Sequence, residues 1–127
     1  MESLNKIKSF YENLSIEDID KLGNIYEEEA FFKDPFNELN SLTLIKKLFS
    51  EMFEELDNPH FKFIDEIMND NQIFLSWDFI FYKNSREYII HGSSHLKVSS
   101  NNKISYHRDY WDVGEELLLK VPIVKSI

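Results

Sequence analysis

The hydrophobic pattern of this 127-residue chain changes its period near residue 60. Before that point apolar residues recur at intervals of three and four, which is the spacing of one face of an α-helix. From Phe61 to Asp112 they alternate with polar residues, as in strands that bury one face. Because a sequence patterned for one element does not pack as the other, the change predicts helices first and a sheet afterwards.

Three segments carry the helical pattern and are expected to form helices. They cover residues 3–13, 15–27 and 41–56. Ser15 and Asp18 have the spacing of a capping box, which would open the second helix. Ser41 would open the third, and the Asp-Asn-Pro sequence at Asp57–Pro59 would end it.

Four alternating segments after residue 60 predict four consecutive strands. The polar turns between them read NDNQ, KNSR and SSNNK, and strands joined by such short turns pair antiparallel. A short extra strand is expected at residues 30–34, between the second and third helices. The chain is long enough for one compact core, so we expect one α+β domain over residues 1–127 with its helices on one face of the sheet.

Composition and charge exclude several classes of protein. The chain carries 23 Asp plus Glu against 14 Lys plus Arg, a net charge of −9, which argues against binding to nucleic acid. No apolar segment approaches the roughly 20 residues of a membrane span, and the N-terminus does not resemble a signal peptide, so we expect a cytoplasmic protein. The apolar C-terminal tail, residues 117–127, needs cover from the domain or from another subunit.

The residues that bind most metals are few or badly spaced in this chain. Cysteine is absent, which excludes thiolate ligands and a thiol nucleophile. His91 and His95 would lie about 13 Å apart on one strand, which is too far for one ion. Gly92 between them is expected to mark a bulge or a close approach of a ligand. We therefore predict neither a metal nor a cofactor.

Asp34 stands in the aromatic stretch FFKDPF, an unusual place for a carboxylate. An ionised acid is expelled from apolar surroundings unless other groups hold it there. The Asp-Pro pair is also a common way to begin a turn. Asp34 is thus either a perturbed acid of a functional site or an ordinary turn residue.

A second candidate acid lies on the last predicted strand, in the sequence YHRDYWD. With a period of two, His107, Asp109 and Trp111 share one face, while Tyr106, Arg108 and Tyr110 share the other. An aspartate flanked by a histidine and a tryptophan on an inward face is hard to explain by packing alone. The alternative is that Arg108 and Asp109 belong to a network of surface ion pairs.

The stretches DIDKLGNIYEEEAFFKDPF and KISYHRDYWDVGEEL, with a long helix and a strand meander between them, resemble the SnoaL-like branch of the nuclear transport factor 2 superfamily. Ketosteroid isomerases and polyketide cyclases share this plan. The resemblance implies a cone-shaped, strongly curved antiparallel sheet wrapped around three N-terminal helices. It also implies an internal pocket and a homodimer formed through the convex side of the sheet.

The resemblance assigns roles to individual residues. Asp34 matches the general base of the isomerases, and Tyr11 matches their hydroxyl donor, although Tyr11 could instead be a core residue. Ser94 stands where the isomerases have a protonated aspartate, which makes steroid isomerisation doubtful. Asp109 matches the acid/base residue of the cyclases, with His107 beside it.

The expected ligand is a small apolar or polycyclic molecule, and the expected chemistry is that of an isomerase or cyclase, or a related lyase or hydrolase. Besides the candidate catalytic residues Tyr11, Asp34, His107 and Asp109, the predicted ligand contacts are Phe31, Phe36, Phe53, Trp77, Phe79, Ser94 and Trp111. The alternative function is a non-catalytic ligand-binding or dimerisation module of the same fold. An enzyme requires Asp34 and Asp109 inside one pocket, whereas the module does not.

Overall fold

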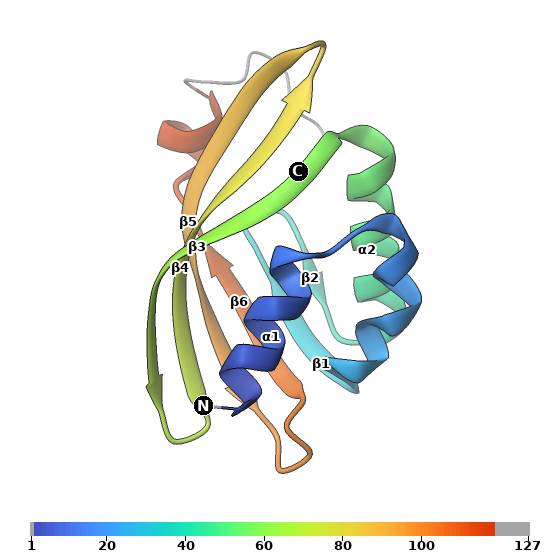
Figure 1. Ribbon diagram of the computed structural model, residues 1–127, viewed down its shortest axis with the longest axis vertical. Coiled ribbons are helices and arrows are strands. Elements are labelled where there is room, and N and C mark those ends of the chain that lie inside the picture. Colours follow the sequence, from blue (N-terminus) through green and yellow to red (C-terminus); the bar gives the residue numbers. More distant parts are fainter. Residues whose placement is uncertain (1, 119–127) are drawn as a thin grey trace.

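The computed structural model describes residues 2–118 and shows the two α-helices on one side of a long curved sheet (Figure 1). The helical elements are α1 (Glu2–Glu12), the 3₁₀ helix η1 (Ile16–Asn24), α2 (Leu42–Glu55) and the π-helix η2 (Val113–Leu118). The strands are β1 (Tyr26–Lys33), β2 (Glu38–Leu39), β3 (Asp57–Asn69), β4 (Gln72–Lys83), β5 (Arg86–Val98) and β6 (Ile104–Tyr110). The predicted α+β class is confirmed.

The sheet has six strands in the order β2-β1-β6-β5-β4-β3 and does not close into a barrel. Strands β3 to β6 form the predicted antiparallel meander. The pairing of β1 with β6 is parallel, however, and here the expectation of an antiparallel sheet was wrong. The two strands are far apart in the sequence and share no hairpin, so no tight turn sets their direction.

The first and third predicted helices form close to their expected bounds. Ser41 caps α2, because its hydroxyl oxygen accepts a hydrogen bond of 3.2 Å from the backbone N–H of Leu44. Ser15 and Asp18 also pair as predicted, with Asp18 Oδ2 accepting from the backbone N–H of Ser15 at 3.0 Å. The turns before β4, β5 and β6 contain left-handed residues at Asp70, at Asn84 and Ser85, and at Asn102.

The prediction for the second helix was wrong beyond Asn24. A 3₁₀ helix replaces the expected α-helix, and Tyr26 begins β1. Pairing with β6 drives this outcome, because the carbonyl of Ile25 accepts a hydrogen bond of 2.7 Å from the backbone N–H of Ile104. A partner so distant in the sequence leaves no local signal.

The hydrophobic core lies between the inner face of the sheet and the helices. On β4 every second residue from Ile73 to Phe81 is buried, as the period of two predicts. The opposing buried residues include Leu4 and Ile7 of α1 and Ile45 and Phe49 of α2. Residues 119–127, which hold most of the predicted apolar tail, lie outside the described residues. In the described part of the chain, no helix has both the length and the hydrophobicity that a membrane span needs.

Candidate functional site

A cavity of about 310 Å³ opens between the inner face of the sheet and the helices α1 and α2. Its wall is mainly apolar and strongly aromatic, with Phe32, Phe49, Phe61, Phe63, Trp77 and Trp111 among the residues that line it. Its polar lining residues are Tyr11, Asp34, Asn37, Glu51, Glu55, Ser94, His107 and Asp109. An apolar cavity with a few converging polar groups is the usual form of a small-molecule site.

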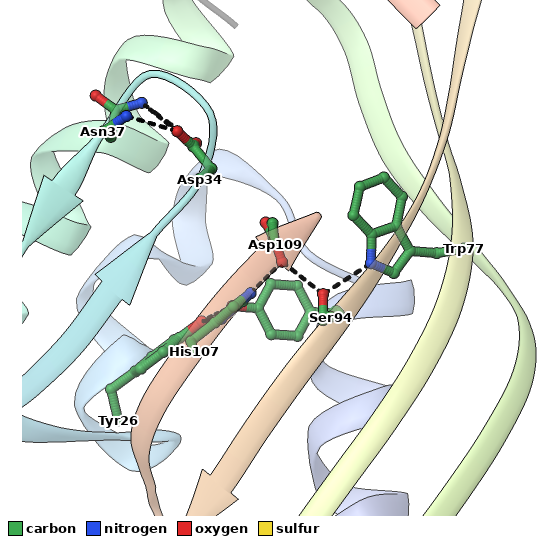
Figure 2. A network of polar contacts seen from close by, with 8 residues as sticks. Tyr26, Asp34, Asn37, Trp77, Ser94, His107 and Asp109 are labelled. Carbon is green, nitrogen blue, oxygen red and sulfur yellow. Dashed lines mark hydrogen bonds and ion pairs between the residues drawn. The ribbon is translucent and has the colours of Figure 1, made fainter. Parts of the chain in front are cut away.

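Asp109 is the centre of a hydrogen-bond network on the sheet wall of this cavity (Figure 2). Its Oδ1 atom accepts a hydrogen bond from the hydroxyl of Ser94 at 2.5 Å and lies 2.6 Å from Nε2 of His107. The indole N–H of Trp77 donates to the Ser94 hydroxyl oxygen at 2.8 Å. Strand β4 supplies Trp77, β5 supplies Ser94, and β6 supplies both His107 and Asp109, so the sheet fixes the geometry of this half of the network.

The other half of the network runs behind His107. Nδ1 of His107 lies 2.6 Å from the hydroxyl of Tyr26, which in turn hydrogen-bonds to the hydroxyl of Tyr11. Burial raises the pKa of both tyrosine hydroxyls above their usual value, so both remain protonated donors.

This arrangement fixes the direction of every hydrogen bond when Asp109 is ionised and His107 is neutral. Tyr11 donates to Tyr26, and Tyr26 donates to Nδ1 of His107. A neutral His107 then carries its proton on Nε2 and donates it to Asp109. The chain of donors from Tyr11 through Tyr26 and His107 and the chain from Trp77 through Ser94 thus both end at Oδ1 of Asp109.

The second oxygen of Asp109 is differently placed. Among residues 2–118 no hydrogen bond to Oδ2 is found, and Figure 2 shows it pointing away from Ser94 and His107. The Asp109 side chain is 14% exposed, and the residue lines the cavity. Oδ2 is therefore the atom that a bound molecule could reach.

Asp34 lies in the loop between β1 and β2 and has features of both of its predicted interpretations. Its Oδ1 atom accepts hydrogen bonds from the backbone N–H groups of Phe36 at 2.8 Å and Asn37 at 2.7 Å, which is the pattern of an Asx turn. The residue also lines the cavity. Burial raises the pKa of its carboxyl despite these hydrogen bonds, and the nearby charge of Asp109 acts in the same direction.

The structure brings together all four candidate catalytic residues and most of the predicted ligand contacts. Phe31 and Phe53 are the exceptions, because neither lines the cavity. Phe31 alternates with the buried residues Ala30 and Phe32, so its ring lies on the outer face and stacks on Tyr106 with 5.3 Å between centroids. Phe53 packs half-buried against the core. Sequence reasoning missed Tyr26, because it placed this residue on a helix.

Gly92 allows the indole of Trp77 to lie directly against β5. A Cβ atom at residue 92 would be 2.5 Å from Cη2 of Trp77, closer than real carbon contacts. The pairing of β4 with β5 shows no register shift here, so the predicted bulge is absent. The close approach at Gly92 belongs to the protein's own tryptophan.

The other histidines of the sheet lie outside the cavity lining. Nδ1 of His91 lies 2.8 Å from Oδ1 of Asp78, and Nε2 of His95 lies 2.7 Å from Oε1 of Gln72. Within residues 2–118 no group of three or more histidine or acidic side chains has the geometry to hold a metal ion.

Comparison with known proteins places this geometry in a family context. Residues 7–107 match the model of the SnoaL-like domain. No curated protein matches the chain.

Three solved structures illustrate the similarity of fold. An LEH-like epoxide hydrolase of M. tuberculosis has a TM-score of 0.78 and 14% identity, covering 92% of this chain and 87% of its own. An NTF2-like protein of unknown function from Burkholderia pseudomallei has a TM-score of 0.81 and 9% identity, covering 95% and 98%. A protein provisionally assigned as a SnoaL-like polyketide cyclase from Shewanella putrefaciens has a TM-score of 0.76 and 13% identity, covering 94% and 98%. At such identities the likeness shows the fold alone.

Proposed function

Because this chain belongs to the family of SnoaL-like domains, we propose that it is a cofactor-free enzyme that moves a proton on a small, largely apolar molecule bound in its cavity. The observation that carries the proposal is the environment of Asp109. One carboxylate oxygen is held by Ser94 and His107, and the other has no hydrogen bond from residues 2–118 although Asp109 lines the cavity. A base that is oriented but still accessible is what general base catalysis requires.

In this mechanism Oδ2 of Asp109 removes a proton from the bound molecule. The donors at Oδ1 hold the carboxylate in one orientation, so that the lone pairs of Oδ2 face the substrate. His107 takes part through its position, because its Nε2–H bond to Asp109 depends on the acceptor role of Nδ1 toward Tyr26. The aromatic wall limits access of water, which strengthens these interactions.

Asp34 is the proposed partner acid. It lines the same cavity, and the charge of Asp109 contributes to the raised pKa of its carboxyl. A protonated Asp34 can return a proton to the substrate while Asp109 takes one, which is the exchange that an isomerase or cyclase acting beside a carbonyl group needs. The epoxide hydrolase and the assigned cyclase among the similar structures support an enzyme on this fold.

The second candidate function is a ligand-binding module without catalysis. The turn hydrogen bonds of Asp34 favour it, because a carboxylate committed to the N–H groups of Phe36 and Asn37 is less able to act on a substrate.

We also propose a homodimer through the outer face of the sheet. Ile67 and Phe74 pair across β3 and β4 on that face and are 69% and 48% exposed.

Deuterium uptake distinguishes the enzyme from the module. A panel of small ketones is incubated with the protein in D₂O, and exchange of the protons beside the carbonyl is followed by NMR. We expect catalysed exchange with at least one ketone and its loss in Asp109→Asn, with binding retained. Asp20→Asn, on the exposed surface of η1, is the matched control. Exchange at the wild-type rate in Asp109→Asn would exclude Asp109 as the base.

A further inference from the structure

We propose that the molecule bound in this cavity carries a positive charge on an apolar body, as a protonated or quaternary amine does. This inference rests on the proposed function, because it names the substrate class of the same site. It follows from two properties of the cavity wall, its charge and its aromatic rings.

The charged groups of the wall are all acidic. Asp34 and Asp109 lie on the loop after β1 and on β6, while Glu51 and Glu55 line the cavity from α2. Among the described residues that line the cavity, none is lysine or arginine. A negatively charged substrate would meet only repulsion from these groups, and a neutral one would leave their charge uncompensated.

Two cationic side chains, Lys33 and Arg108, line a second hollow together with Asp34 and Asp109, but both lie on the outer face of the sheet and have other partners. Lys33 Nζ donates to a carboxylate oxygen of Glu38 at 2.8 Å. The guanidinium of Arg108 lies 4.8 Å from the centre of the Tyr110 ring. Because Arg108 alternates with His107 and Asp109 along β6, it cannot point into the cavity with them.

The two aspartates are close enough for the charge of Asp109 to affect the pKa of Asp34. Burial is the main cause of the raised pKa of Asp34, and the charge of Asp109 adds to it. Among the described residues, no cationic group contributes in the opposite direction. A cation bound near both carboxylates would relieve this repulsion, which is a source of affinity that a neutral ligand lacks.

The aromatic rings of the cavity wall supply the second contribution to the binding of a cation. Trp77 packs edge to face with Phe61 at 5.4 Å, and Trp111 packs in the same way with Phe36 at 5.6 Å. All four rings line the cavity. Aromatic faces attract ammonium groups, tryptophan most strongly, and they also bury the apolar body of such a ligand. Carboxylates combined with aromatic rings therefore favour a ligand that has both a positive charge and an apolar body.

The test compares two molecules of equal shape that differ only in charge, choline and 3,3-dimethylbutan-1-ol. Both are transparent where tryptophan absorbs. The chain has two tryptophans, Trp77 and Trp111, and both line the cavity, so intrinsic fluorescence reports its occupancy. We expect choline to bind at least about tenfold more tightly than the alcohol. Asp34→Asn and Asp109→Asn should each reduce this ratio, whereas the exposed Asp20→Asn should leave it unchanged.

Each outcome decides a different point. Equal binding of the two molecules, or tighter binding of the alcohol, would overturn the inference and leave the proposed proton transfer intact. A preference for choline that survives in both site variants would overturn the assignment to Asp34 and Asp109. If neither molecule changes the fluorescence, the inference fails. The deuterium exchange measurement still tests the proposed function separately, because it uses neutral ketones.

Discussion

Replacement of Gly92 by alanine tests whether the tryptophan wall of the cavity is as tightly packed as the structure indicates. The new Cβ atom would lie 2.5 Å from Cη2 and 2.9 Å from Cζ3 of Trp77. The indole cannot easily rotate away, because its Nε1–H group is bonded to Ser94 and its ring packs against Phe61. Either β5 or Trp77 must therefore shift.

The expected loss of stability follows from these contacts. Overpacking of a well-packed core costs about 1–3 kcal/mol. If the indole moves far enough to lose its hydrogen bond to Ser94, a further ~0.5–1.5 kcal/mol is lost. We therefore expect Gly92→Ala to lower the free energy of unfolding by about 2–4 kcal/mol, a large share of the roughly 5–15 kcal/mol of a typical domain.

Urea denaturation followed by circular dichroism measures this difference, and tryptophan emission shows whether Trp77 has moved. Gly23→Ala is the matched control, because its Cβ atom would make an ordinary contact of 3.5 Å with Leu42 Cδ2. A Gly92→Ala variant with stability within about 0.5 kcal/mol of the wild type, the range of neutral surface changes, would refute the packing argument.

Two further substitutions probe the network and the outer face. Tyr26→Phe should lower the free energy of unfolding, measured by urea denaturation, by about 1–3 kcal/mol, because it leaves Nδ1 of buried His107 without its partner. Tyr82→Phe, which removes an exposed hydroxyl, should change the free energy of unfolding little. Ile67→Glu should dissociate the proposed homodimer in sedimentation, whereas Lys6→Glu on the exposed side of α1 should not. A wild-type protein that sediments as a 15.2 kDa monomer at high concentration would contradict the dimer.

The parts of the site that sequence reasoning could predict are those that depend on local periodicity. Alternation along the last strand placed His107, Asp109 and Trp111 on one face, and all three line the cavity. Alternation also predicts that Phe31 turns away from the cavity once the buried positions Ala30 and Phe32 are known. The sequence alone does not show which of the adjacent Phe31 and Phe32 faces the core, because both are aromatic.

The parts that escaped prediction depend on pairing between distant strands. Tyr26 reaches His107 only because β1 lies beside β6 in parallel, an arrangement that no turn residue specifies. Trp77 reaches Ser94 because β4 and β5 pair in one particular register, with Gly92 directly opposite Trp77. The sequence thus indicated most of the candidate residues that line the cavity, and tertiary structure determined how they are connected.

Asp34 provides the last prediction, because its two interpretations differ in how its charge affects stability. Burial raises its pKa in the folded protein above the ordinary value. Between the ordinary pKa and the raised one, the folded state binds more protons than the unfolded state, so stability falls as pH rises through this window. Asp34→Asn keeps an oxygen that can accept the N–H bonds of Phe36 and Asn37 but cannot ionise. The variant should therefore gain stability relative to the wild type as pH rises.

Urea titrations of both proteins across this window give the difference in their free energies of unfolding at each pH, and the carboxylates that they share largely cancel in it. A purely structural Asx turn predicts the opposite trend. If the N–H donors of Phe36 and Asn37 outweighed burial, they would lower the pKa of Asp34, and the wild type would gain relative to Asp34→Asn as pH rises. That result would remove the poised acid from the proposed mechanism. It would leave Asp109 as the one aspartate whose environment supports proton transfer, because the network of Ser94 and His107 does not involve the turn.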